Sequence, residues 1–276
     1  MDINPVELAG HVKDAESFHL PFGLEIPLPH GTVEVLGREI HLRLTKFMAL
    51  ELVAALLMLL IFIPLARNIA TGQRPRGRIW NLFEAVLLFV RDEMVRPAIG
   101  RPEADRFLPF IWTLFIFILF CNLLGLVPWA GSPTGSISVT AAMALIAFGV
   151  VMGAGMKKSG LLGFWTGLVP HMELPWLLAI LLKPMILFIE IFGLLIKHTI
   201  LAVRLLANMF AGHLVLAVIM GFILLFVGKI AWYGVMPAAV LGATALNLLE
   251  LFVAFLQAYI FAFLTALFIG MALHQH

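Results

Sequence analysis

Continuous apolar stretches of about 20 residues or more dominate this sequence, and a helix of that length spans the roughly 30 Å hydrocarbon core of a bilayer. Of its 276 residues, 62% are hydrophobic and 12% charged, against about 45–50% and about 25% in soluble domains. The backbone in lipid must hydrogen-bond within its own segment, and these stretches lack the alternation of a membrane β-barrel. The sequence therefore predicts an all-α integral membrane protein.

Composition also argues against several classes of function. A net charge of +2 gives no reason to expect a nucleic-acid partner. The single cysteine, Cys121, lies within an apolar stretch, and no CxxC or HExxH motif occurs, so no metal and no cofactor are expected. The phosphate-binding pattern GxxxxGK[ST] is likewise missing, and we expect no nucleotide site.

Hydropathy divides the chain into a polar tail, residues 1–44, and a single membrane domain, residues 45–276. The tail has no basic segment followed by an apolar one, so no cleavable signal peptide is expected. Within the membrane domain we expect five membrane-embedded helices, over residues 45–66, 107–127, 137–156, 176–226 and 237–273.

A further helix is expected over residues 79–95, on the cytoplasmic surface of the membrane. Polar residues such as Asn81 and Arg91 interrupt its apolar character, which is typical of an amphipathic helix lying in the interface. Its expected apolar face consists of Trp80, Phe83, Val86, Leu87 and Val90.

Basic residues set the expected orientation. Arg67, Arg74, Arg76 and Arg78 follow the first span, and Lys157 and Lys158 follow the third. The positive-inside rule assigns both clusters to the cytoplasm. We therefore expect an outer N-terminus, a cytoplasmic C-terminus, and a multi-pass protein of a bacterial inner membrane.

The last two helices are unusually long. Residues 176–226 would extend roughly 75 Å as one helix, far more than the thickness of a bilayer core. Such a helix must be strongly tilted, kinked near Pro184, or broken. Residues 237–273 form a second long helix, for which strong tilting is also expected.

Arg204 is the outstanding polar residue of the first long helix. Arginine is not deprotonated in proteins, and an arginine at membrane depth costs about 3 kcal/mol even on the lenient insertion scale. One interpretation is a structural ion pair with Glu190 or Glu250. The other is a fixed positive charge on an ion pathway.

Spacing on both long helices predicts polar strips. Glu190, Lys197 and Arg204 recur every seven residues and share a face, on which Asn208 also lies, whereas His213 points roughly to the opposite side. On the last helix Glu250 and Gln257 are also seven apart. Simple alternatives exist for three of these residues. Lys197 could be merely solvated, and Asn208 and Gln257 could form interhelical hydrogen bonds.

Three segments together resemble subunit a of the F-type ATP synthase. They are RLLANMFAGH from Arg204 to His213, ELFVAFLQAYIFAFL from Glu250 to Leu264, and NLLGLVP from Asn122 to Pro128. Their order and separation agree with that family over roughly residues 45–273. The tail before residue 45 carries no such resemblance.

The resemblance implies a non-catalytic, ion-translocating subunit that works with a ring of c subunits, the b-subunit stator stalk and the rest of the complex. It implies that Arg204 faces the ring, that Gln257 packs beside it, and that Glu190 belongs to a cytoplasmic half-channel. Family members carry either Glu or His at the positions of His213 and Glu250, and here the pair is exchanged relative to many of them.

On this basis we expect an outer half-channel lined by Asn208, His213 and Glu250. A secondary transporter or permease with a midplane arginine is the main alternative, although the inverted repeats and matched helix breaks of such proteins are not evident. An intramembrane hydrolase would need a nucleophile beside a base, yet Ser136 and Ser138 have no histidine nearby in the sequence.

Overall fold

The computed structural model describes residues 17–19, 25–27, 30–35, 38–43, 45–70, 77–101, 103–127, 131–169 and 176–274. These residues form two compact units, which are described separately. Unit 1 comprises Met1–Ile63, Ile116–Val139 and Leu205–Gln257, and unit 2 comprises Pro64–Phe115, Thr140–Arg204 and Ala258–His276.

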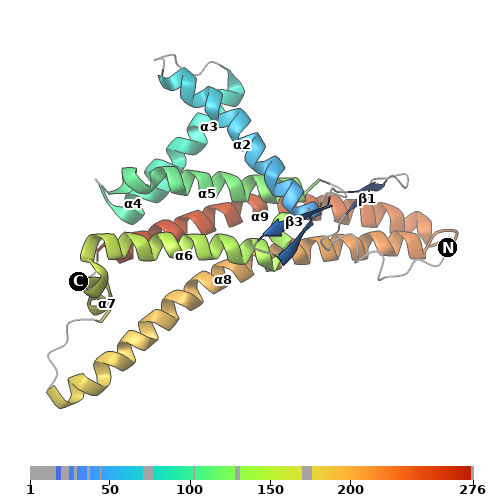
Figure 1. The fold of residues 1–276 in the computed structure, drawn as a ribbon. Helices are drawn as coiled ribbons and strands as arrows, with labels where there is room; N and C mark the ends of the chain where they lie inside the picture. Colours follow the sequence, from blue (N-terminus) through green and yellow to red (C-terminus); the bar gives the residue numbers. More distant parts are fainter. Residues whose placement is uncertain are drawn as a thin grey trace. The chain divides into compact units, whose positions relative to one another are not determined.

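Five helices are long and apolar enough to cross a membrane, with mean hydropathy between 2.1 and 2.6. This confirms the predicted all-α membrane protein. The bounds differ from the expected ones by at most five residues, within a turn and a half of helix. The helices, labelled in Figure 1, are α2 (Lys46–Ala70), α5 (Ala104–Gly125), α6 (Ile137–Ser159), α8 (Trp176–Leu225) and α9 (Trp232–Leu273).

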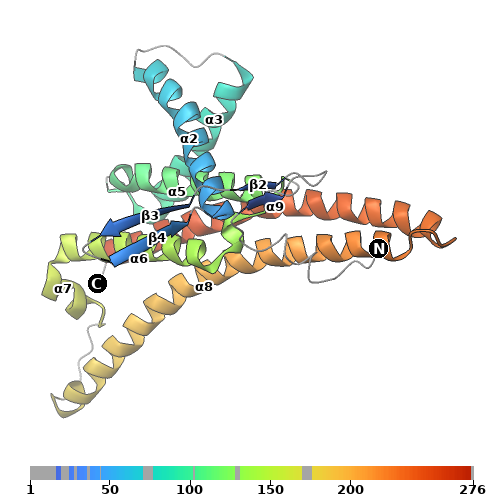
Figure 2. The same cartoon turned by 45° about the vertical axis from the view of Figure 1, so that its right-hand side comes forward.

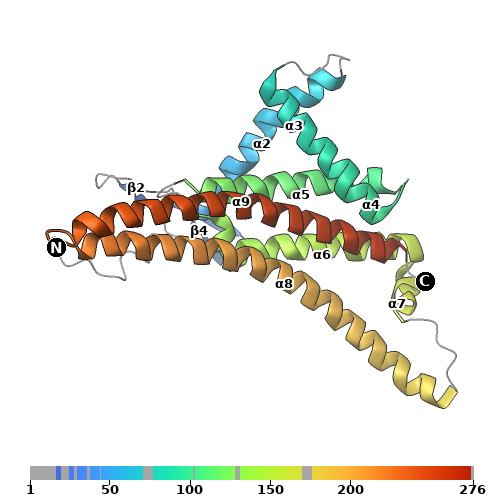
Figure 3. The same cartoon turned by 180° about the vertical axis from the view of Figure 1, so that it is seen from behind.

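The two longest helices are continuous. Helix α8 has 50 residues and includes Pro184, and helix α9 has 42 residues and includes Pro237. Figure 3 shows both from behind as unbroken coils. Of the three alternatives for residues 176–226, a break in the helix is therefore wrong.

Short strands precede the first helix in unit 1, where the sequence predicted only a polar tail. Strand β1 (Ser17–His19) pairs antiparallel with β2 (Glu25–Pro27), and β3 (His30–Val35) pairs with β4 (Arg38–Arg43) (Figure 2). Val33 and Val35 alternate with polar residues, which is typical of a strand. The low mean hydropathy of the whole segment concealed this alternation. Helix α2 then begins after Thr45, whose Oγ1 accepts a hydrogen bond from the Met48 amide at 3.4 Å.

The expected surface helix lies in unit 2 and is longer than predicted. Helix α3 (Arg78–Phe89) runs into a π-helical segment, η2 (Val90–Val95), and then into α4 (Arg96–Ile99), which ends at Gly100 with φ of 84°. The residues of its expected apolar face are all half-buried or buried, whereas Asn81 is exposed. The π-helical segment was not predicted, because a single residue added to a turn leaves no clear mark on hydropathy.

A stripe of small residues lets α9 pack closely within unit 2. Ala258, Ala262, Ala266 and Gly270 follow one another at intervals of four, and all are buried. Their spacing places them on one face of the helix. A Cβ atom on Gly270 would overlap the carbonyl oxygen of Ala98, so the α9 backbone lies against the end of α4.

Helix α6 ends beside a short helix of the same unit. Gly160, with φ of 77°, separates α6 from α7 (Leu161–Gly167). Phe164 of α7 is 1% exposed, and its ring fills the space that a side chain at Gly155 of α6 would need. The same Cβ would lie 3.3 Å from the carbonyl oxygen of Ala272, which brings the end of α9 to this junction.

Candidate functional site

Arg204 lies on α8, in unit 2, with its side chain half-buried. Neither a hydrogen bond nor an ion pair joins its guanidinium to any residue that the structure describes. Glu190 is 14 residues earlier on the same continuous helix, a separation of about 21 Å along the helix axis. The structural alternative of an ion pair with Glu190 is therefore excluded.

Glu190 lines a cavity of unit 2 with a volume of about 330 Å³. Lys197 lines the same cavity, as expected for two residues seven apart on one helix. His274, from the end of α9, is a third polar lining residue, and the aromatic rings of Phe164 and Phe268 contribute apolar surface. The cavity thus gathers a carboxylate, an ammonium group and an imidazole.

Lys197 is exposed, and its Nζ lies 5.9 Å from the centre of the Phe268 ring. This distance is at the limit of a cation–π contact. The ammonium end of the exposed side chain thus lies over an aromatic ring, and the simple interpretation of Lys197 as merely solvated stays a prediction.

His274 was not predicted as a site residue, because its contacts come from residues far away in the sequence. Its Nε2 lies 3.0 Å from the carbonyl oxygen of Ile99 and 3.6 Å from Oε2 of Glu103. Oε1 of Glu103 in turn forms an ion pair of 2.8 Å with Nζ of Lys158. Because of this hydrogen bond to Lys158, the pKa of Glu103 is lowered from its ordinary value.

His198 is a second histidine without a predicted role. It is 2% exposed, and its Nδ1 donates a hydrogen bond of 2.9 Å to the carbonyl oxygen of Leu194. The rings of Phe148 and Phe268 lie 5.1 Å from it, centre to centre. These contacts are those of a packed core histidine.

In unit 1, α8 and α9 meet at Gly212 and Glu250. A Cβ atom on Gly212 would lie 2.8 Å from Cδ of Glu250 and would overlap its carboxylate. Glycine is therefore required for the carboxyl group to occupy this position. Glu250 is only 8% exposed, and its Oε1 is buried without a hydrogen-bond partner among the described residues.

His213 lies next to Gly212. Its Nε2 atom is also buried and has no hydrogen-bond partner among the described residues. No ion pair between His213 and Glu250 is formed in the described part of unit 1. Two titratable side chains with unsatisfied atoms nevertheless lie within one residue of the same helix–helix contact. Their action as a pair stays a prediction.

The two amide residues of the expected site, both in unit 1, differ in their environments. Gln257 on α9 is 5% exposed, whereas Asn208 on α8 is exposed. Neither side chain forms a hydrogen bond to another described residue, so the interhelical hydrogen bonds considered for them are not formed in this part of the chain.

Asn122 connects α5 to two other segments of unit 1. Its Nδ2 donates a hydrogen bond of 3.1 Å to the carbonyl oxygen of Ala254 on α9, and its Oδ1 accepts one of 2.8 Å from Thr134. Thr134 belongs to the short helix η3 (Pro133–Gly135) and is also bonded to Ser132 at 2.8 Å. This explains the asparagine of the segment Asn122–Pro128, whereas Pro128 itself lies outside the described residues.

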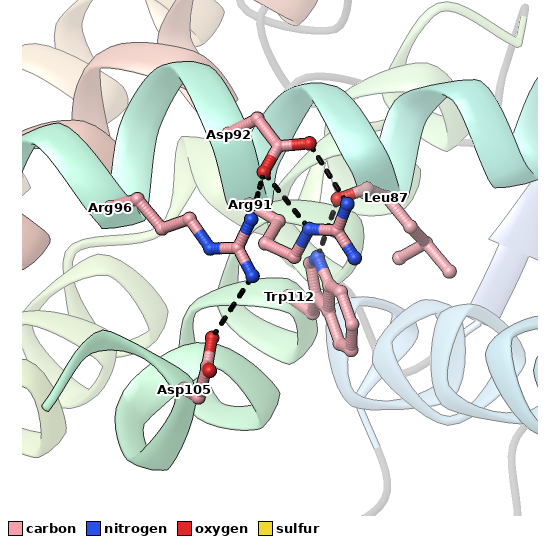
Figure 4. Close-up of polar contacts among 6 residues, drawn as sticks. All are labelled: Leu87, Arg91, Asp92, Arg96, Asp105 and Trp112. Carbon is pink, nitrogen blue, oxygen red and sulfur yellow. Dashed lines mark hydrogen bonds and ion pairs between the residues drawn. The ribbon is translucent and has the colours of Figure 1, made fainter. Parts of the chain in front are cut away.

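Charged residues join the surface helix to the start of α5 in unit 2 (Figure 4). Asp92 contacts Arg91 at 2.9 Å and Arg96, and Arg96 also lies 3.6 Å from Asp105. Because Arg91 hydrogen-bonds to it, the pKa of the Asp92 carboxyl is lowered from its ordinary value. Trp112 adds a hydrogen bond of 2.9 Å from its indole nitrogen to the carbonyl oxygen of Leu87.

Residues 48–270 match the family described as ATP synthase A chain. The chain belongs to this family. The match to the A chain family includes nearly all of each of the five membrane helices and every site residue predicted from the sequence, whereas His274 lies beyond it.

Individual members of the A chain family are similar over nearly the whole chain. ATP synthase subunit a of Myxococcus xanthus is 38% identical over 99% of this chain and 89% of its own length. That of Chloroherpeton thalassium is 38% identical over 98% of this chain and 78% of its own length. ATP synthase subunit a 2 of Chlorobaculum tepidum is 36% identical, with coverages of 95% and 71%.

The similarity therefore extends into the first 44 residues, for which the three motifs gave no information. Together with the five apolar helices, these relatives identify a multi-pass protein of a bacterial inner membrane, a subunit of the ATP synthase of the F type.

Proposed function

We propose that this subunit is the proton-channel part of the stator, which couples proton flow across the membrane to rotation of a c-subunit ring and so to ATP synthesis. Arg204 is the observation that carries the proposal. This arginine is half-buried in an apolar helix of an ATP synthase subunit, and no described residue is its counterion. Placing such a charge in a membrane costs free energy, which is explained if the residue acts on an ion pathway. The subunit itself is non-catalytic and is held by the b-subunit stalk.

The proposed outer half-channel consists of Asn208, His213 and Glu250. The buried and unsatisfied atoms of His213 and Glu250 support this role, because such atoms need a mobile partner such as water or a proton. Histidine titrates near neutral pH, so it can exchange protons with water at the membrane surface.

The proposed cytoplasmic half-channel includes Glu190. Its support is the cavity shared with Lys197 and His274, which gives water a route to the carboxylate. In this orientation the N-terminus is outside and the C-terminus, with His274, is cytoplasmic.

Arg204 and the buried Gln257 would act on the carboxylate of a c subunit. A carboxylate facing lipid must be protonated, but opposite a fixed guanidinium it can ionise. Arg204 thus stabilises the deprotonated carboxylate of the c subunit. Its positive charge also prevents protons from passing directly from one half-channel to the other. Each proton that crosses about 100 mV supplies about 2.3 kcal/mol, so several protons are needed per ATP.

Two substitutions of Arg204 test the proposal. The matched control is Lys183→Gln, at an exposed lysine three heptads earlier on α8 that does not line the cavity of Glu190. Arg204→Lys should abolish ATP-driven proton pumping, because an ammonium group lacks the planar fork of the guanidinium and loses its proton more readily when buried. Arg204→Ala should also make the membrane leaky to protons. The readout is acidification of inverted membrane vesicles that contain the assembled complex.

Pumping by Arg204→Lys above about half that of the wild type would contradict the proposal, as would an Arg204→Ala variant that is assembled and does not leak. Lys183→Gln should pump nearly normally, because its ammonium group is exposed and lies outside this cavity.

A further inference from the structure

A second cavity of unit 2 has a basic rim and an apolar interior. Its volume is about 360 Å³, and it lies where α5 begins and α6 ends. The rim carries Arg106, Lys157 and Lys158 together with one carboxylate, Glu103. The proton pathway proposed above uses none of these residues.

The carboxylate of this rim is already neutralised. Glu103 pairs with Lys158 at 2.8 Å and also lies 3.6 Å from His274. Arg106 and Lys157, in contrast, are exposed and have no ion pair with any residue in the described ranges. The guanidinium carbon of Arg106 lies 6.0 Å from the centre of the Phe107 ring, beside the opening. Two cations are thus available to an anion at this rim.

The interior of the cavity suits hydrocarbon. Phe107, Val150 and Ala154 line it, and Leu273 closes it from α9. Gly153 also lines it, and a Cβ atom added there would meet no other atom within 4 Å. Helices α5, α6 and α9 are all long and apolar enough to cross a membrane. A cavity near their ends is therefore expected at the depth of lipid headgroups.

We propose that this cavity binds an anionic phospholipid. Its phosphate would lie at Arg106 and Lys157, and an acyl chain would pass over Gly153. A free phosphate ion would leave the apolar interior unused, and an acidic protein segment would not match an apolar interior at membrane depth. Charge and apolar surface in one cavity fit an amphiphile, and basic pockets at the ends of membrane helices are typical sites for acidic headgroups.

Photolabelling of the intact ATP synthase complex tests the proposal. The complex is placed in phosphatidylcholine vesicles with a trace of photoreactive phosphatidylglycerol, and labelled peptides are identified by mass spectrometry. We expect labelling of the segments around Phe107 and Gly153. Unlabelled phosphatidylglycerol should compete strongly, whereas added phosphatidylcholine or inorganic phosphate should not.

Paired variants localise the site. Gly153→Leu fills the cavity and should reduce labelling at least about tenfold, whereas Gly149→Leu, one turn earlier at an equally open glycine, should leave it unchanged. Arg106→Gln and Lys157→Gln should each weaken labelling about fivefold, as expected for one cation at a membrane surface. Arg101→Gln, an exposed arginine outside the cavity, is the charge control.

Several results would overturn the proposal. Equal competition by phosphatidylcholine would indicate a non-selective lipid contact, and equal competition by inorganic phosphate would indicate a simple anion site. Wild-type labelling of an assembled Gly153→Leu complex, or no labelling of these segments at all, would show that no lipid enters the cavity. If Gly153→Leu fails to assemble, Arg106→Gln and Lys157→Gln provide the test. Unchanged labelling in these two variants would refute the site.

Discussion

In unit 1 the carboxyl group of Glu250 is buried against the backbone of Gly212, whereas in unit 2 that of Glu190 lines a cavity of about 330 Å³. Oε1 of Glu250 has no hydrogen-bond partner among the described residues, whereas Glu190 shares its cavity with Lys197 and His274. A group in a tight contact tolerates little change of shape, because neighbouring atoms cannot move away. A group at an open cavity can be replaced by water and by other polar side chains. The two proposed half-channels should therefore differ in their sensitivity to mutation.

Among the variants that compare these two regions, the largest effect is expected at Gly212. In Gly212→Ala, the new methyl group would occupy the place of the Glu250 carboxylate and displace it. Overpacking of this kind costs about 1–3 kcal/mol, so we expect proton pumping to fall about tenfold or more. The measurement is ATP-driven acidification of vesicles at equal amounts of assembled complex.

Gly193→Ala is the matched control for Gly212→Ala. Gly193 lies on the same helix, and a Cβ atom there would meet nothing within 4 Å. Its pumping should remain within about twofold of the wild type, because no neighbour has to move. Similar pumping by Gly212→Ala and Gly193→Ala would contradict the expected difference in sensitivity between the two regions.

The next effect concerns His213 and Glu250 as a pair. His213→Glu and Glu250→His each put two like groups near one contact and should each reduce pumping strongly. The double exchange should restore more activity than either single variant, because one acid and one imidazole are again present. Strictly additive losses across this double-mutant cycle would remove the pair from the mechanism.

A smaller effect is expected at Glu190. Since water and other groups of the cavity can carry a proton, Glu190→Gln should reduce pumping only about two- to fivefold. In a Cys121→Ser background, Glu190→Cys should react with a small water-soluble thiol reagent applied from the cytoplasmic side. Reaction from the outer side alone would invert the proposed orientation.

The smallest effect concerns the pH dependence of the partly exposed pair Glu103–Lys158. The pKa of Glu103 is lowered by Lys158, so its stabilising contribution is present at neutral pH and is lost as the pH falls through the lowered pKa. Thermal unfolding of the complex, followed by helix content, should therefore show slightly less destabilisation by acid for Glu103→Gln than for the wild type. An equal acid response in both proteins would show that the pair contributes nothing.

Hydropathy alone predicted the five membrane helices, because the thickness of a bilayer fixes the length of each apolar stretch. Heptad spacing correctly predicted that Glu190 and Lys197 share a face, since both line one cavity. The apolar face of the surface helix also followed from its periodicity.

Other features depend on contacts between distant residues and were not predictable from local pattern. Asn122 bonds to Ala254, 132 positions later, and His274 contacts Ile99, 175 positions earlier. The sequence marks Gly212 as part of a motif, but only the neighbouring carboxylate explains why a side chain is excluded there. The β-hairpins before residue 44 were missed because their polar average concealed a short alternation.

The unbroken backbone of α8 has a consequence for how an ion travels. Where a membrane helix unwinds, its freed carbonyl oxygens can replace the hydration shell of a metal ion. Along α8 the carbonyl groups near Arg204 and His213 accept hydrogen bonds within the helix itself. An ion passing here must be handed from one side chain or water molecule to the next. The rate of ion passage then depends on a few separate side chains and water molecules. A point mutation can change one of these side chains without altering the helix backbone.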